Sequence, residues 1–512
     1  MTAAFYPTTG KRKDLYLLGI VWLVAIIIFY PVAYSDYLYA DEAIQLWQYK
    51  PTGPADFTIA IRQGRWITEL LFAWSYGAVD TVHQLSWIRL FSLAGWLVCL
   101  PVWYFILKRL VKENPAYQYL PFFICLYLVT SLPFSVSIHW SVCFELFLAN
   151  TTGLLAGYWA YQSVQVNNGK VKIKPGLVCM AVIAGVFSLF TYQSGFCCFV
   201  IPFLVHLLKT QFSKKEQAGL LGILLFPLIC IIYFPLFRLS LVLTHIPNFD
   251  RTNIHIDPLH KLEYFFSHPF ERSFWFNILV DENNKLAKAL YKILFLGWLV
   301  VTFVRFGKSN YLGAIKYLVA VMLLFLLSYF PSMIIEENYA SNRSQLALNI
   351  CVFLVCLETV VYFLKNRQVL KITGLTVACV LIASGWYNFR YQFLRPVTAE
   401  YAMVKNYLQQ HYNAGIKQLY FIKLPEDALK NKFHVNTSMD EFGVPASFFS
   451  WTVEFLPRQL VFELTGNRQT ADQLTIKHWP DMESFTQSGE AMTNNVLLVN
   501  LPEIINSGNA PH

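Results

Sequence analysis

Charged residues are scarce in this chain: Asp, Glu, Lys and Arg together make up 14% of its 512 residues. Soluble domains contain about 25%, so the shortage excludes an ordinary soluble enzyme. Hydrophobic residues account for 56% of the chain. We therefore predict a polytopic membrane protein. The net charge of +9 then indicates basic loops on one side of the membrane rather than a nucleic-acid surface.

Motifs for disulfides, metals and nucleotides are absent as well. All ten cysteines lie inside apolar stretches, with no CxxC and no Cys/His pairing, which excludes a disulfide framework and a zinc site. His255 and His260 fit no metal-ligand spacing, and neither a P-loop nor a GxGxxG occurs. We expect no cofactor and no nucleic-acid partner, and no divalent metal is indicated.

Long apolar runs are what the chain does contain. A bilayer needs about 20 apolar residues per helix, which predicts an all-α membrane protein of about eleven transmembrane helices. The first follows Lys11, Arg12 and Lys13 and has no small-residue cleavage site after it, so we expect it to be retained. The predicted spans are 15–34, 85–107, 118–137, 141–162, 176–193, 195–208, 217–242, 287–304, 312–334, 344–364 and 370–387.

The distribution of basic residues predicts the orientation of these spans. Three Lys or Arg residues fall in each of six segments, and the short turns 138–140, 194–195 and 335–342 contain none. This asymmetry places the N-terminus in the cytoplasm. The six basic segments are 11–13, 108–112, 170–174, 209–215, 305–316 and 365–371.

Three long stretches are therefore expected on the extracytoplasmic side: 35–84, 243–286 and 388–512. In the first, "FTIAIRQGRWITELLFAWSYG" spreads apolar residues at mostly helical spacing, which predicts an amphipathic helix in the membrane interface. The tail mixes short apolar runs with polar turns and suits one small α/β domain. We divide the chain into a transmembrane module, 1–387, and this extracytoplasmic domain, 388–512.

Nearly all charges at membrane depth gather at the outer ends of the predicted spans. Such charges are costly and tend to mark substrate sites. Arginine forms bidentate, charge-assisted bonds to phosphate, and a carboxylate can take a proton from a sugar hydroxyl. This combination predicts a lipid-phosphate donor. The candidate phosphate-binding residues are Arg62, Arg65, Arg251 and Arg343, and the candidate sugar- or acceptor-binding residues are His139, Glu145, Tyr192 and Gln193.

A basic N-terminal segment, one span and an acidic pair in a long outer loop resemble the GT-C superfamily of polyprenyl-phosphate-sugar-dependent glycosyltransferases. "YADEAIQ", "RQGRWITELLF", "LFTYQSGFCCFVIPFL" and "NYASNRSQLAL" resemble its O-antigen glucosyltransferase branch, over roughly residues 15–390. The tail does not match that branch clearly. The resemblance implies a first-loop carboxylate as catalytic base, which maps onto Asp41 or Glu42. We favour Asp41, with Glu42 orienting the acceptor, because adjacent side chains diverge.

The resemblance further implies an enzyme of the bacterial inner membrane, in contact with membrane lipid, whose C-terminal domain is periplasmic. It would move one sugar, a hexose such as glucose, from a polyprenyl-phosphate donor to a glycan or lipid-linked acceptor. Two other classes stay open: a transporter or flippase for a lipid-linked glycan, and a non-catalytic cell-envelope assembly protein. A flippase would need ionisable residues near the bilayer midplane, and few are present.

Each candidate residue also has a structural alternative. The acidic pair fits a helix N-terminus, the arginines fit snorkelling to headgroups or helix ends, His139 and Glu145 fit a hydrogen-bonded pair, and Tyr192 and Gln193 fit packing of a turn. The catalytic interpretation therefore makes one geometric demand. Asp41 must share a hollow with the arginines, and an Asp41 directed into bulk solvent would contradict it.

Overall fold

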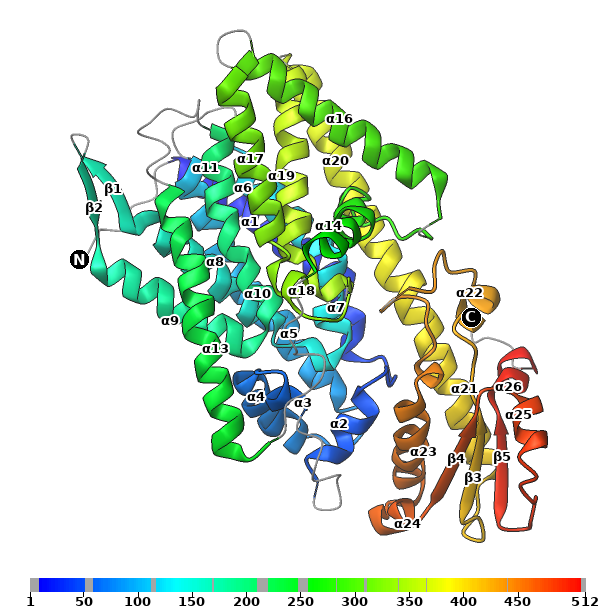
Figure 1. The fold of residues 1–512 in the computed structure, drawn as a ribbon. Helices are drawn as coiled ribbons and strands as arrows, with labels where there is room; N and C mark the ends of the chain where they lie inside the picture. The colour runs from blue at the N-terminus through cyan, green and yellow to red at the C-terminus, as the bar shows by residue number, and fades with distance from the viewer. Residues whose placement is uncertain are drawn as a thin grey trace.

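The computed structural model describes residues 9–50, 59–111, 117–167, 170–209, 220–246, 257–281, 283–307, 311–338, 340–364, 366–439 and 441–507. Its main body is a bundle of helices, and a small sheet near the C-terminus lies to one side of it (Figure 1). The bundle comprises α1 (Thr9–Phe29), α5 (Leu85–Val111), α6 (Leu120–Thr130), α7 (Leu132–His139), α8 (Leu146–Ser163), α9 (Pro175–Thr191), α10 (Gln193–Phe196), α11 (Ile201–Lys209), α13 (Leu225–Thr244), α16 (Lys285–Gly307), α17 (Tyr311–Leu327), α19 (Leu346–Phe363) and α20 (Arg367–Tyr387).

Shorter elements connect these helices, and three of them, α2, α3 and α4, lie together at one end of the bundle (Figure 1). They are η1 (Tyr30–Ala33), α2 (Glu42–Gln48), α3 (Ile59–Arg62), α4 (Trp66–Gly77), η3 (Ser141–Cys143), η4 (Cys197–Val200), η5 (Leu220–Leu224), α14 (Pro258–Ser267), α15 (Pro269–Ser273), α18 (Phe330–Ile334) and η7 (Asn342–Ser344). A hairpin of β1 (Val164–Asn167) and β2 (Lys170–Ile173) projects from the opposite end.

Six helices of the described chain are long and apolar enough to cross a bilayer, and a seventh is added if α6 and α7, bent by 49°, form one span. This supports a membrane protein but not the predicted count of eleven. The other four predicted spans are helical, but α9, α10–α11 and α17 are shorter, and α8 includes Asn150, Thr151 and Thr152. Polar residues of this kind lower the hydropathy of α8.

The bend between α6 and α7 follows from the local sequence "TSLPFS". Ser131 has extended backbone dihedrals, and its side chain accepts a hydrogen bond from the Phe134 amide at 3.3 Å. Pro133 sits in the first turn of α7, where its missing N–H costs nothing, whereas in mid-helix it would break the hydrogen-bond ladder. The chain therefore stops one helix at Thr130 and starts another.

The amphipathic helix predicted in the first loop is interrupted. Gly64 has a φ of +74°, which ends α3 and lets α4 start at Trp66. The Gly64 carbonyl accepts a hydrogen bond from the Tyr233 hydroxyl on α13 at 3.1 Å. On α4, Leu70 and Trp74 are 67% and 62% exposed, which suits contact with lipid headgroups.

The C-terminal segment contains a three-stranded parallel sheet in the order β4–β3–β5, with Gln418 opposite Thr475 and Val496. The predicted boundary at 387/388 falls where α20 continues through the π-helical η8 (Asn388–Leu394) into α21 (Arg395–His411), so a single rod joins bundle and sheet. The other elements are β3 (Gln418–Ile422), α22 (Ala428–Phe433), η9 (Ala446–Phe448), α23 (Ser450–Thr465), α24 (Arg468–Asp472), β4 (Thr475–Trp479), α25 (Met482–Gln487), β5 (Val496–Asn500) and α26 (Leu501–Ser507).

Close helix packing in the bundle depends on two glycines of α8. A Cβ placed on Gly153 would meet the backbone carbonyl of Gly195, and one on Gly157 would meet that of Phe199. Small residues four apart allow backbones to approach in this way inside membranes. Helix α8 therefore packs directly against α10 and η4, which fixes the position of the Tyr192–Gln193 turn.

We predict that Gly157→Ala destabilises the protein by about 1–3 kcal/mol, because the new methyl group collides with backbone rather than with a movable side chain. The matched control is Gly297→Ala on α16, where a Cβ has no neighbour within 4 Å. That change should leave stability unchanged or raise it by up to about 1 kcal/mol. Thermal unfolding of both variants in detergent measures the difference, and equal midpoints would contradict the packing.

Candidate active site

A cavity of about 280 Å³ opens at the end of the bundle where α1 and α9 finish and where α8 and α19 begin. Its walls come from the first loop, from α13, from α18 and from the turns before α8 and α19. Six of the ten predicted site residues line it: Asp41, Arg65, Glu145, Tyr192, Gln193 and Arg343. The structure thus brings together residues as far apart in the sequence as Asp41 and Arg343, which are separated by 302 positions.

Asp41 is the N-cap residue of α2 and is partly exposed in the cavity wall. Its side chain does not cap the helix by a hydrogen bond. The residue before it, Ala40, has a φ of +45°, a conformation that costs an L-residue energy and tends to occur at functional sites. The positive φ of Ala40 helps to determine the direction of the Asp41 side chain.

Glu42 is fully buried and lies outside the cavity lining. Its Oε2 lies 2.8 Å from the Arg89 guanidinium on α5, and its Oε1 accepts bonds of 2.7 Å from both the amide and the hydroxyl of Ser141. The Tyr39 amide donates to it as well, at 2.9 Å. Both carboxylate oxygens are thus occupied within the protein, which leaves Glu42 a structural role in place of the predicted acceptor orientation.

Arg65, at the N-cap of α4, is held in place by two of the other predicted residues. Its Nε donates to Gln193 Oε1 at 3.1 Å, and its guanidinium carbon lies 4.0 Å from the centre of the Tyr192 ring. The Gln193 amide group in turn donates to the Gln63 carbonyl and to the Tyr233 hydroxyl. Arg65 is thereby oriented into the cavity by groups on α9, α10 and α13.

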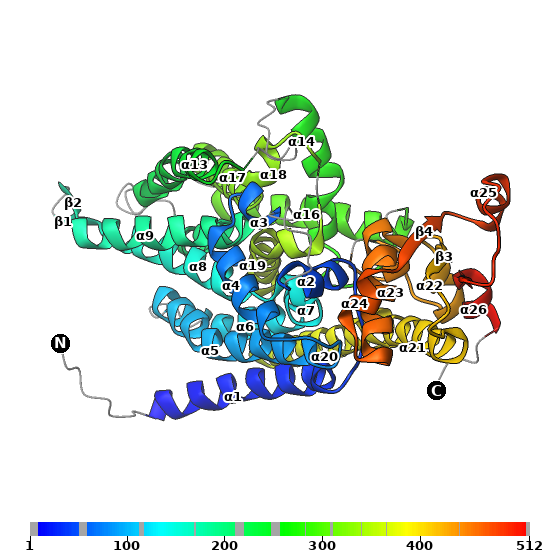
Figure 2. The ribbon, with the colours of Figure 1, turned by 90° about the horizontal axis from the view of Figure 1, so that it is seen from below.

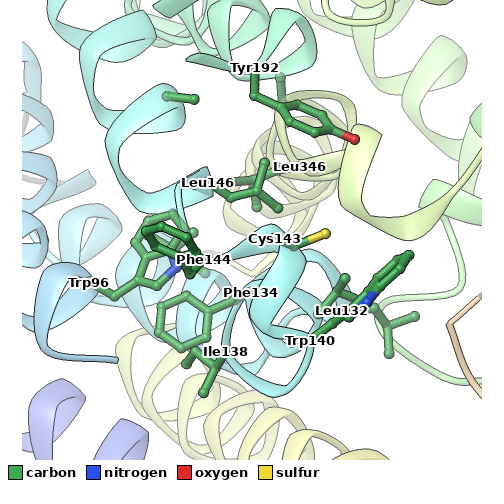
Figure 3. Packing of buried hydrophobic residues seen from close by; sticks show 14 of the residues in the cluster. Trp96, Leu132, Phe134, Ile138, Trp140, Cys143, Phe144, Leu146, Tyr192 and Leu346 are labelled. Atoms are coloured by element: carbon green, nitrogen blue, oxygen red, sulfur yellow. The ribbon is translucent and has the colours of Figure 1, made fainter. Parts of the chain in front are cut away.

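Arg343 reaches the same cavity from η7. Its guanidinium carbon lies 4.5 Å from the centre of the Trp140 ring, and its Nη1 lies 3.8 Å from the Cys143 sulfur. In Figure 3 the Tyr192 hydroxyl and the Cys143 sulfur both face away from the apolar cluster of Trp96, Phe134 and Phe144.

Glu145 lies in the turn before α8, outside the candidate membrane-spanning helices, and is 1% exposed. Burial raises the pKa of Glu145 to about 7, although the charges of Arg65 and Arg343 oppose the rise. Its Oε2 has no hydrogen-bond partner among the described residues. A buried carboxyl that is only partly ionised near neutral pH leaves much of the positive potential of the two arginines for a ligand.

No family model, curated protein or solved structure matches this chain.

Two of the remaining predicted residues, Arg62 and His139, are not brought into the cavity. Arg62 ends α3 beside it but is not part of the lining. His139 is fully buried, with its ring centre 3.5 Å from that of Phe393, so it supports the C-terminal segment rather than a sugar. Arg251 lies outside the described residues.

The cavity also contains polar residues that the sequence did not single out as sites, among them Gln45, Gln63, Tyr233, Ser332 and Glu337. Glu337 is one of two carboxylates at the end of a predicted span, and that position was its only signal. Tyr233 lies within an uninterrupted apolar run and had none. Within the described residues, no group of three or more His, Cys, Asp or Glu side chains is placed to hold a metal ion.

The adjacent carboxylates should respond differently to loss of charge. We predict that Glu42→Gln lowers the free energy of unfolding by about 3–5 kcal/mol, because Arg89 then remains charged and buried without its counter-ion. Asp41→Asn should change it by less than about 0.5 kcal/mol, because Asp41 is partly exposed and makes no cap. Thermal unfolding in detergent compares the two. Equal losses would contradict the assignment of Glu42 as the structural partner.

Proposed function

We propose that this protein is a GT-C type glycosyltransferase that moves a sugar, a hexose such as glucose, from a polyprenyl-phosphate donor to a hydroxyl of a glycan or lipid-linked acceptor. One observation carries the proposal: a carboxylate, Asp41, shares a single cavity with two guanidinium groups, Arg65 and Arg343. The arrangement is the one that the catalytic interpretation of the sequence demands.

The two arginines are suited to the phosphate of the donor. Guanidinium groups present fixed pairs of donors that match phosphate oxygens. Arg65 reaches the cavity from the first loop, where its guanidinium lies over the Tyr192 ring. Arg343 reaches it from η7, where its guanidinium lies over the Trp140 ring. Positive charge fixed in this way stabilises both the bound donor and the phosphate that leaves.

The lipid chain of the donor can pack against an apolar wall of the cavity. Phe234 and Phe237 of α13, with Pro331, Ile334 and Ile335 at α18, form one side of the cavity. Helix α13 belongs to a candidate membrane span of which only 28% is buried, so most of its surface faces the bilayer. A donor can therefore present its headgroup to the arginines while its chain stays among apolar side chains and lipid.

Asp41 supplies the base in a single displacement. Its carboxylate accepts the proton of the acceptor hydroxyl, and the oxygen attacks the anomeric carbon of the sugar. The bond between that carbon and the phosphate oxygen breaks, and polyprenyl phosphate leaves with the electron pair. The sugar is transferred with inversion, and no covalent intermediate with the protein forms. We place the reaction on the extracytoplasmic face, the side that the basic-loop pattern favours, and in a bacterial inner membrane, as the resemblance implies.

Asp41→Asn should lower the rate of sugar transfer by about 10²–10⁴-fold, the usual contribution of a general base. Transfer is measured in vesicles that contain the purified protein, with radiolabelled polyprenyl-phosphate glucose as donor and extracted cell-envelope glycolipid as acceptor. The control is Asp36→Asn, an exposed carboxylate that pairs with His83 at 2.9 Å outside the cavity. Normal transfer by Asp41→Asn would remove the catalytic role.

Arg343→Gln should raise the KM for the donor by about 10-fold or more, because it removes a charge-assisted bond to the phosphate. Arg62→Gln serves as comparison, since Arg62 was an equal candidate from sequence but does not line the cavity. Its effect on the donor KM should be within about twofold. Initial rates at varied donor concentration separate the two, and the reverse order would contradict the site.

A further inference from the structure

Helix α23 of the C-terminal segment packs along α2, the helix whose N-cap residue is Asp41 (Figure 2). The guanidinium carbon of Arg468 lies 4.5 Å from the centre of the Trp47 ring. Gln459 donates to the Asp80 carbonyl at 2.8 Å, and Glu463 accepts from the Val82 amide at 2.7 Å. The first loop is therefore held between the bundle on one side and the C-terminal segment on the other.

One bond from α23 reaches the backbone directly before Asp41. The hydroxyl of Thr452, which is fully buried, donates to the Ala40 carbonyl at 3.1 Å. Ala40 is the residue with a φ of +45°. A non-glycine residue in this region costs about 1–3 kcal/mol and persists only where its surroundings enforce it. Thr452 is a group that enforces it.

A second contact from the C-terminal segment reaches the arginine. Glu441 accepts a bond of 3.1 Å from the Asn342 side chain through Oε2, and its Oε1 lies 3.9 Å from Arg343 Nε. The Glu441 side chain is 4% exposed. The next residue, Phe442, pairs with Met439 through backbone bonds and packs edge-on against the His139 ring. Glu441 is thus placed rigidly beside η7.

We infer that Thr452 and Glu441 are positioning residues for the transfer reaction, an inference that rests on the proposed function. Neither lines the cavity. Thr452 acts through Ala40 and aims the Asp41 carboxylate at the acceptor. Glu441 acts through Arg343 and holds its guanidinium toward the donor phosphate. Residues 388–512 are then a part of the active site and more than a cover over it.

The two residues should affect different kinetic constants. Thr452→Val keeps the shape of the side chain and removes its hydroxyl, so kcat should fall about 10-fold or more while the donor KM stays within about twofold. Thr452→Ser should retain kcat. Ala40→Gly should restore part of it in the Thr452→Val background, because glycine adopts a positive φ without strain. Unchanged kcat in Thr452→Val would overturn the role of Thr452.

Glu441→Gln should instead raise the donor KM about fivefold or more. Combined with Arg343→Gln it should add nothing, as expected when one residue acts through the other. Additive effects on the donor KM would overturn the role of Glu441. The matched controls lie on α23: Thr465→Val, whose hydroxyl bonds to the backbone of Val461 and Asn467 and not to the first loop, and the exposed Glu454→Gln. Both should resemble the unmodified protein.

A measurement that does not depend on activity separates this inference from the proposed function. In Asp41→Cys, the rate of modification by a water-soluble maleimide reports the placement of the side chain. Adding Thr452→Val should change that rate about threefold or more, whereas adding Thr465→Val should not. An unmodified protein that transfers no sugar would contradict the proposed function. An unchanged labelling rate would overturn the positioning role of Thr452, whatever the transfer assay shows.

Discussion

The buried pair of Glu42 and Arg89 is the interaction on which the site depends. The Glu42 carboxylate and the Arg89 guanidinium, neither of them exposed to solvent, lie 2.8 Å apart, between the start of α2 and the N-terminal part of α5. A buried charge is tolerated only when it is paired and hydrogen-bonded, so α2 has one acceptable orientation. With Glu42 directed into the bundle, the preceding residue, Asp41, lies on the side of the cavity.

Much of the helical bundle could be predicted from the long hydrophobic runs in the sequence. The apolar stretches predicted near 15–34, 85–107 and 217–242 correspond to helical segments of membrane-spanning length at Arg12–Ala33, Leu85–Val111 and Leu220–Thr244. The number of spans was less predictable. Helix α8 contains polar side chains that form hydrogen bonds inside the bundle, and a hydropathy pattern does not reveal those bonds. The break at Gly64 was equally hidden, since a single glycine in an amphipathic pattern is also compatible with an uninterrupted helix.

The site was predictable in kind but not in detail. The resemblance pointed to Asp41, and the scarcity of charge near the membrane pointed to Arg65 and Arg343, and these three residues line the cavity. The sequence does not distinguish the roles of two adjacent carboxylates. The buried position of Glu42 became evident only from its partner Arg89, which lies 47 positions away inside an apolar run. His139 was predicted as a site residue because it lies at the outer end of a predicted span. Its burial against Phe393, 254 positions away, could not be read from the sequence. Tyr233 lies in an apolar helix, where an aromatic residue is more often part of the core.

The cavity joins three environments that the proposed lipid-linked sugar donor would need at once. Arg65 and Arg343 provide fixed positive charge, α13 and α18 provide an apolar wall beside the bilayer, and the C-terminal segment closes against α2. Burial raises the pKa of Glu145, which lies in the same cavity wall as the two arginines. Each environment comes from a different part of the chain.

A cryo-electron microscopy structure of the protein in nanodiscs with polyprenyl phosphate tests this account most directly. The account predicts phosphate density within hydrogen-bond distance of both Arg65 and Arg343, with the prenyl chain leaving along Phe234 and Phe237. Lipid phosphate bound elsewhere, with this cavity empty at saturating ligand, would contradict it.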